Sequence, residues 1–172
     1  IQGIGGEGLN AFTAYDVTCY MNSFPAYQME RWLTLYADRL TNPVFRSFQA
    51  ELENVFEEYN MYEDNPSTHV RKTLMSTIFA GHPYERDVIG LPEHLKNPRL
   101  SKLIDFYNTW YVPNNMALII VGDFDTEATK PMIEETFGRL EYKELPARPT
   151  YTKTSFTGNP KHKFKMGYYP MV

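Results

Sequence analysis

Two glutamates about a third of the way along the chain have the spacing of a paired carboxylate site. Glu51 and Glu58 are seven residues apart. On a helix this is two turns, which brings the two side chains back to within about 20° of each other around the axis. One carboxylate on such a face can bind a divalent cation while the other helps to orient its ligands. The same segment also holds Glu53 and Glu57, and from spacing alone a solvated acidic face is the preferred interpretation.

The histidines do not form a helical zinc motif. They occupy positions 69, 82, 94 and 162. No two are four residues apart, the spacing that places both imidazoles on one helical face. Glu93 and His94 match the end of an H-x-x-E-H motif, but Gly90 replaces its first histidine and Pro92 interrupts the helix. Each histidine is therefore interpreted as a surface or hydrogen-bonded residue.

Two other kinds of chemistry are disfavoured. Cys19 has Thr18 and Tyr20 as neighbours and no basic residue beside it, so it is interpreted as a small buried side chain rather than a nucleophile. The glycine-rich segment 3–8 lacks the Lys-Ser/Thr ending of a phosphate-binding loop and precedes a strand instead of a helix.

Hydrophobic periodicity predicts the elements that position these residues. Apolar residues at helical spacing predict helices over about 25–42, 45–62, 68–79, 98–111 and 126–137. Strands are predicted at 9–13 and 17–24, which would pair, at 116–121, which would be buried on both faces, and at 164–169. The stretch 82–97 is expected to be irregular and 145–160 to be a connector. The fold class is therefore α+β, a mixed or antiparallel sheet flanked by helices.

Composition narrows the classes of protein further. A length of 172 residues with 42% hydrophobic residues is enough for the core of one domain. The net charge of −4 argues against a nucleic-acid binder or a polybasic membrane-surface protein, because both need a cationic face. No apolar run approaches the roughly 20 residues of a transmembrane helix. A single cysteine excludes an internal disulfide framework, and nothing in the chain indicates a compartment.

Short motifs follow one another in a fixed order along residues 5–140. They are Gly5-Gly6, Asn10-Ala11-Phe12-Thr13, Ala37-Asp38-Arg39-Leu40, Asn42-Pro43, Glu51 with Glu58, Asp64-Asn65-Pro66, His82-Pro83-Tyr84, Tyr111-Val112-Pro113-Asn114-Asn115-Met116 and Val121-Gly122-Asp123-Phe124. Together they resemble the pitrilysin/insulinase family of zinc metallopeptidases, the inverzincins, which include the mitochondrial processing peptidases.

The resemblance implies a role for each of the paired glutamates. In that family two histidines of an H-x-x-E-H helix and a distant downstream glutamate hold the zinc, and the glutamate of the motif is the general base. By position, Glu58 resembles the third zinc ligand and Glu51 the supporting glutamate. The H-x-x-E-H helix would then lie before residue 1. Zinc is accordingly expected in the full-length parent and not in this fragment, which we expect to be inactive by itself.

The resemblance also implies how a peptide binds. Asn10, Ala11, Phe12 and Thr13 resemble the family's edge strand, to which the substrate peptide adds as an extra antiparallel strand. An ordinary edge strand is the alternative interpretation. The expected partners are a peptide substrate and a second half-domain or partner subunit. Residues 1–145 are expected to form a peptidase-domain core incomplete at its N-terminus, and 146–172 a connector and the first strand of the following part, so that the excerpt is truncated at both ends.

The resulting functional hypothesis is a zinc-dependent endopeptidase in the full-length parent. The alternative is a non-catalytic homologue that serves as a substrate-binding or scaffolding subunit, and the presence of both Glu51 and Glu58 favours the active type. An unrelated α+β interaction domain is the third possibility. An intact H-x-x-E-H upstream would distinguish the first from the second.

Overall fold

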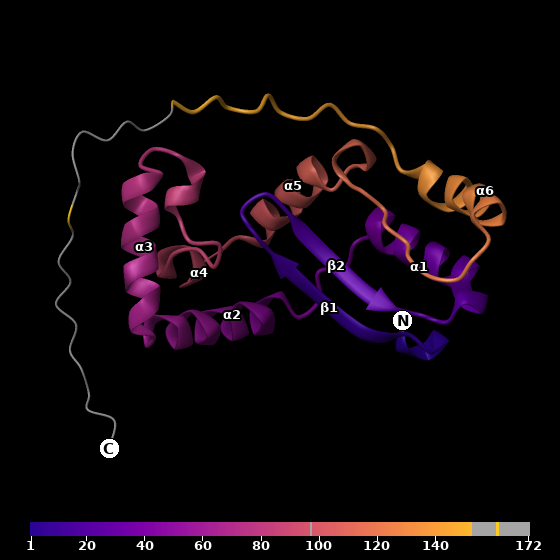
Figure 1. The fold of residues 1–172 in the computed structure, drawn as a ribbon, viewed down its shortest axis with the longest axis horizontal. Helices are drawn as coiled ribbons and strands as arrows, with labels where there is room; N and C mark the ends of the chain where they lie inside the picture. Colours follow the sequence, from indigo (N-terminus) through magenta and orange to yellow (C-terminus); the bar gives the residue numbers. More distant parts are fainter. Residues whose placement is uncertain (97, 153–160, 162–172) are drawn as a thin grey trace, which may run out of the picture. The chain divides into compact units, whose positions relative to one another are not determined.

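A computed structural model describes residues 1–172 except 97, 153–160 and 162–172. The described residues divide into two compact units (Figure 1). Unit 1 comprises residues 1–46 and 99–147. Unit 2 comprises residues 47–98 with the described residues after 147. The strand expected at 164–169 lies outside the described residues.

The predicted hairpin forms in unit 1. Strand β1 (Glu7–Thr13) pairs antiparallel with β2 (Thr18–Ser23), with Ala11 opposite Tyr20 and Thr13 opposite Thr18. The amide of Ala14 donates to the carbonyl of Val17 at 2.8 Å and closes the turn. This sets one register from Thr13 back to Asn10, and the register shifts between Asn10 and Glu7.

The core of unit 1 lies on helix α1 (Met29–Thr41). Met29, Trp32, Leu33 and Ala37 are its buried residues, and they recur at helical spacing on one face. Helix α6 (Thr126–Thr136) runs beside α1 in Figure 1 and contributes apolar side chains to the same cluster. Asp125 caps α6 by accepting from the amides of residues 127 and 128, at 2.9 and 3.1 Å. Helix α5 (Leu100–Trp110) completes the helices of this unit.

Unit 2 is helical. Its helices are α2 (Phe48–Glu63), α3 (Pro66–Ile78) and the short α4 (Pro92–Lys96). The side chain of Asn65 accepts from the amide of Ser67 at 3.0 Å, and Pro66 takes the first position of α3. An asparagine cap followed by proline starts a helix and prevents the preceding one from continuing, so α2 and α3 are separate helices.

Three expectations from the sequence need correction. No strand forms at 116–121 in the described part of the chain, and Ile119 and Val121 are 80% and 90% exposed instead of buried. Met116 has extended backbone angles, but a strand also needs a hydrogen-bonded neighbour, and no described segment supplies one. The stretch 82–97 contains α4 and a 3-10 turn, Pro83–Glu85. Helix α1 starts at Met29 because Pro25 is extended and a 3-10 turn, Ala26–Gln28, precedes the helix.

The α+β class is confirmed by a two-stranded antiparallel sheet and six α-helices in the described residues. Further 3-10 turns lie at Gln2–Ile4, Pro113–Asn115 and Phe137–Arg139. In these same residues, no helix combines the length and the apolar character that crossing a bilayer requires.

Candidate functional site

Helix α2 carries both glutamates of the candidate metal site. Glu51 lies in its first turn and Glu58 two turns later, and both side chains are exposed. Their seven-residue spacing places them on the same side of the helix, with about 10.5 Å of helical rise between them. A glutamate side chain is too short to cover that distance alone. Glu51 is therefore not placed to contact the Glu58 carboxylate directly.

Neither carboxylate is engaged elsewhere. Among the described residues, no hydrogen bond or ion pair involves the side chain of Glu51 or Glu58. Glu53, by contrast, accepts from the side-chain amide of Gln49 at 3.2 Å. A carboxylate without a protein partner keeps its oxygens available to a cation, and zinc accepts carboxylate oxygen as a ligand.

The described residues contain no group of three or more histidine, cysteine, aspartate or glutamate side chains able to hold a metal ion. A tetrahedral zinc site needs at least three protein ligands. The described residues therefore do not form a complete tetrahedral zinc site by themselves.

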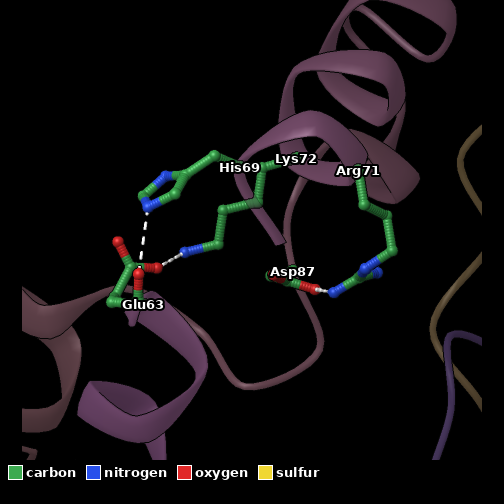
Figure 2. A network of polar contacts seen from close by, with 5 residues as sticks. All are labelled: Glu63, His69, Arg71, Lys72 and Asp87. Atoms are coloured by element: carbon green, nitrogen blue, oxygen red, sulfur yellow. Dashed lines mark hydrogen bonds and ion pairs between the residues drawn. The ribbon is translucent and has the colours of Figure 1, made fainter. Parts of the chain in front are cut away.

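Polar contacts from α3 hold the C-terminal end of α2 (Figure 2). Lys72 Nζ forms an ion pair with Glu63, and His69 Nε2 lies 3.0 Å from the Glu63 carbonyl oxygen. Lys72 Nζ is also 4.9 Å from the centroid of the Tyr59 ring. Burial would lower the pKa of Lys72, but the hydrogen bond and charge of Glu63, with smaller contributions from Tyr59 and Asp87, outweigh it and raise that pKa.

A second ion pair fixes α3 on its other side. Arg71 contacts Asp87, which lies in the segment between α3 and α4 (Figure 2).

The first half of α2 meets α4 across an open groove of about 390 Å³, lined by apolar and polar side chains. These are Gln49, Leu52, Glu53, Phe56, Glu57, Leu95 and Lys96. Helix α2 is therefore bordered by α4 along the groove and by α3 at its C-terminal end.

The four residues of the candidate substrate strand all lie in β1. Asn10, Ala11, Phe12 and Thr13 are exposed, and in the part of the chain that the structure describes β1 pairs only with β2. In an antiparallel ladder the residues alternate between hydrogen-bonded and non-hydrogen-bonded pairs. Counting from the bonded pair at Ala14 and Val17, the main-chain groups of Ala11 and Thr13 point away from β2, toward the open edge.

The Asn10 side chain forms a hydrogen bond with one of these main-chain groups at the edge. Its Oδ1 accepts from the amide of Ala11 at 2.8 Å. An edge with unpaired amides is prone to pairing with any extended chain, so this local hydrogen bond satisfies the donor while no peptide is present.

Sequence reasoning missed the contacts between α2 and α3. Glu63 and Lys72 are nine residues apart with the break at Asp64–Pro66 between them, so no single helical period relates them. The histidine interpretation agrees with His69 and with His82, whose Nδ1 accepts from the amide of Tyr84 at 3.2 Å. His94 is exposed on α4, and His162 lies outside the described residues. Cys19 is half-buried.

Comparison with solved structures identifies the class of domain. A protease from Helicobacter pylori has the same fold, with a TM-score of 0.76 and 24% identity over 88% of this chain and 37% of that one. A mutant of the ferredoxin protease FusC, solved in complex with Arabidopsis ferredoxin, has a TM-score of 0.75 and 27% identity over 84% of this chain and 17% of FusC. The fold is that of a protease-domain segment.

Comparison of sequences gives the family. Residues 1–91 match the insulinase family (Peptidase family M16), and residues 99–168 match the Peptidase M16 inactive domain. Because the first match alone covers more than half of the 172 residues, the chain belongs to the M16 insulinase family.

The curated relatives are much longer than this chain. The uncharacterized zinc protease YmfH from Bacillus subtilis is 32% identical over 143 residues, which are 82% of this chain and 33% of YmfH. The probable zinc protease PqqL from Escherichia coli is 27% identical over 143 residues, which are 78% of this chain and 15% of PqqL. The chain spans about a third of the length of YmfH.

Proposed function

We propose that the full-length protein is a zinc-dependent endopeptidase to which this chain contributes one metal ligand, its supporting carboxylate and a peptide-binding strand. The observation that carries the proposal is the exposed Glu58 carboxylate, which has no described partner, on a helix of a chain in the M16 insulinase family. The zinc protease names of YmfH and PqqL support the same metal and reaction class.

Glu58 serves as an anionic oxygen ligand in this proposal. Zinc, when bound, supplies Lewis acidity that activates water near neutral pH. Glu58 brings a negative charge and a fixed direction of approach, because it is in the interior of a 16-residue helix. The remaining ligands, the two histidines of an H-x-x-E-H helix, come from a part of the full-length protein outside this chain.

Glu51 accepts a hydrogen bond from a histidine ligand in this proposal. The two-turn separation from Glu58 leaves room for an imidazole between the carboxylates. A carboxylate that accepts the second N–H of a metal-bound imidazole fixes the tautomer and the ring orientation. This assignment explains why the supporting residue lies on the same side of α2 as the ligand but not beside it.

The edge of β1 holds the peptide. The main-chain groups of Ala11 and Thr13 point away from β2, and an extended peptide can pair with them whatever its sequence. The Asn10 side chain must leave the Ala11 amide when the peptide binds. We place a second half-domain or partner subunit of the same family opposite this edge, enclosing the peptide.

The non-catalytic alternative predicts the same fold without turnover. A scaffolding homologue has no need for a free carboxylate at either position, whereas the chain has both Glu51 and Glu58. The test uses the full-length protein, in which zinc content and cleavage of an unstructured peptide are measured before and after chelator treatment. We expect one zinc per site and turnover that chelator abolishes and added zinc restores. Zinc-free protein that binds the peptide without cleaving it would favour the scaffold.

A further inference from the structure

We propose that Lys72 is a positioning residue for Glu58, because its contacts with Tyr59 and Glu63 fix the rotation of α2 about its own axis. The inference rests on the proposed function, in which Glu58 is a zinc ligand. No motif of the sequence indicated this role for Lys72, and the contacts that carry it lie entirely within unit 2.

Lys72 contacts two residues of α2, Tyr59 and Glu63, that lie on the face next to Glu58. Tyr59 and Glu63 are one helical turn apart, so they lie on one face. The Lys72 ammonium forms an ion pair with Glu63 (Figure 2). It also lies 4.9 Å from the centroid of the Tyr59 ring. Glu58 directly precedes Tyr59, and its side chain leaves the helix about 100° away around the axis. Holding Tyr59 and Glu63 toward α3 therefore determines the direction in which Glu58 points.

The rest of the described chain fixes this rotation less firmly than the core fixes that of α1. No residue of α2 is fully buried, and its apolar stripe of Phe48, Leu52, Val55, Phe56 and Tyr59 is only half-buried, whereas α1 has four buried residues. A helical side chain ends about 6 Å from the axis. A rotation of about 20° would therefore displace the Glu58 carboxylate by about 2 Å, whereas metal–ligand distances vary by only about 0.2 Å. A small loss of rotational order would thus have a large effect on a metal site.

The ion pair of Lys72 with Glu63 is partly buried. The side chains of Lys72 and Glu63 are 28% and 31% exposed, in contrast to the pair of Lys130 and Glu127 on α6, at 59% and 82%. Partly buried ion pairs are screened less by solvent and salt than exposed ones. His69 adds a contact to the Glu63 carbonyl at 3.0 Å, so two side chains of α3 hold the same residue of α2.

The test measures zinc affinity in the full-length protein by competition with a chromogenic chelator. The Lys72→Met variant keeps the length of the side chain and removes the charge. We expect its zinc dissociation constant to rise about tenfold, within the range found when groups that orient metal ligands are altered. Lys72→Arg restores the charge and should recover most of the affinity. Lys130→Met removes an exposed ion pair and is the matched control, with unchanged affinity.

Two further measurements separate positioning from folding. Circular dichroism at the assay temperature reports whether each variant is folded, and the visible spectrum of the cobalt-substituted protein reports the ligand geometry, which we expect Lys72→Met to change. If Lys72→Met does not fold, Glu63→Gln removes the same ion pair and takes its place.

A folded variant with wild-type affinity and an unchanged cobalt spectrum would overturn the inference while leaving the proposed function intact. If the wild-type full-length protein binds no zinc, both the inference about Lys72 and the proposed function are wrong.

Discussion

The phenol oxygens of Tyr20 and Tyr111 lie 2.7 Å apart, although 91 residues separate them in the chain. Tyr107 stacks on Tyr111 with ring centroids 4.4 Å apart, and its hydroxyl donates to the Leu40 carbonyl at 2.9 Å. The guanidinium of Arg39 lies 4.9 Å from the centroid of the Tyr20 ring. These contacts join β2, α1 and α5 in unit 1 where the two-stranded sheet alone would provide little cohesion.

This tyrosine cluster should make the stability of the protein sensitive to alkaline pH. Burial, followed by the contacts with Tyr20, raises the pKa of Tyr111, and burial also raises that of Tyr107. A raised pKa means that the unfolded chain ionises first, so the stabilisation is complete below about pH 10 and is lost as pH rises above it. Urea unfolding at pH 7, 9 and 10.5 should show this loss.

The variant Tyr111→Phe should reduce the loss. At pH 7 it removes one hydrogen bond, worth about 1 kcal/mol, and between pH 9 and 10.5 its stability should fall less than that of the wild type. Tyr142→Phe, at a 73% exposed position, is the control. Equal pH dependence in the wild type and Tyr111→Phe would contradict the assignment.

Leu33 should be among the most sensitive positions for stability. This residue of α1 is fully buried in a cluster to which Met132 and Ile133 of α6 contribute, whereas Leu35 on the same helix is 44% exposed. Leu33→Ala should cost about 3–5 kcal/mol of unfolding free energy, because it removes buried methyl groups and leaves a cavity. Leu35→Ala should cost less than about 1 kcal/mol. Chemical denaturation of both variants measures the difference, and similar costs would place Leu33 outside the core.

Glu58→Gln should abolish peptidase activity and zinc retention in the full-length protein without unfolding it. Glutamine keeps the size of the side chain but removes the negative charge that the cation requires. Glu57→Gln alters the adjacent exposed glutamate of the same helix and should be close to wild type. Metal analysis, turnover and circular dichroism are the measurements, and full turnover by Glu58→Gln would exclude Glu58 from the site.

Glu51→Gln should give a milder defect. A group that orients a metal ligand typically changes metal affinity or activity by about 10–100-fold, and the amide can still accept one hydrogen bond. Zinc titration and turnover should therefore place this variant between the wild type and Glu58→Gln. A loss as complete as that of Glu58→Gln would indicate that Glu51 binds the metal directly.

The sequence predicted the helices whose apolar residues recur with the helical period. The stripe of Met29, Leu33 and Ala37 gave α1, because helix packing follows the 3.6-residue period. The segment 116–121 has the composition of a strand, but a strand exists only with a hydrogen-bonded neighbour, and composition does not reveal the neighbour.

The contacts of the candidate site illustrate the same limit. The seven-residue spacing of Glu51 and Glu58 was enough to predict that both lie on the same side of α2. The ion pair of Lys72 with Glu63 joins two helices, and its geometry depends on how α2 and α3 meet, which no periodicity within one helix encodes.

The open edge of β1 yields the last prediction. The main-chain groups of Ala11 point away from β2, so its amide takes no part in the ladder with Tyr20. Proline lacks the amide and is tolerated on edge strands where that donor faces outward. Ala11→Pro should therefore preserve the hairpin while removing a donor that a peptide strand would use. We expect kcat/KM for an unstructured peptide to fall at least tenfold in the full-length protein, with zinc content unchanged.

The conservative variant Ala11→Ser retains the amide and should stay within about twofold of wild type, which separates the main-chain donor from the methyl side chain. Circular dichroism and zinc analysis confirm that Ala11→Pro is folded and metal-loaded. If the folded, zinc-containing proline variant cleaves the peptide at the wild-type rate, peptides do not add to β1 through Ala11. The ordinary edge strand would then be the better description of this segment, because a main-chain interaction that tolerates any sequence must still lose affinity when its donor is removed.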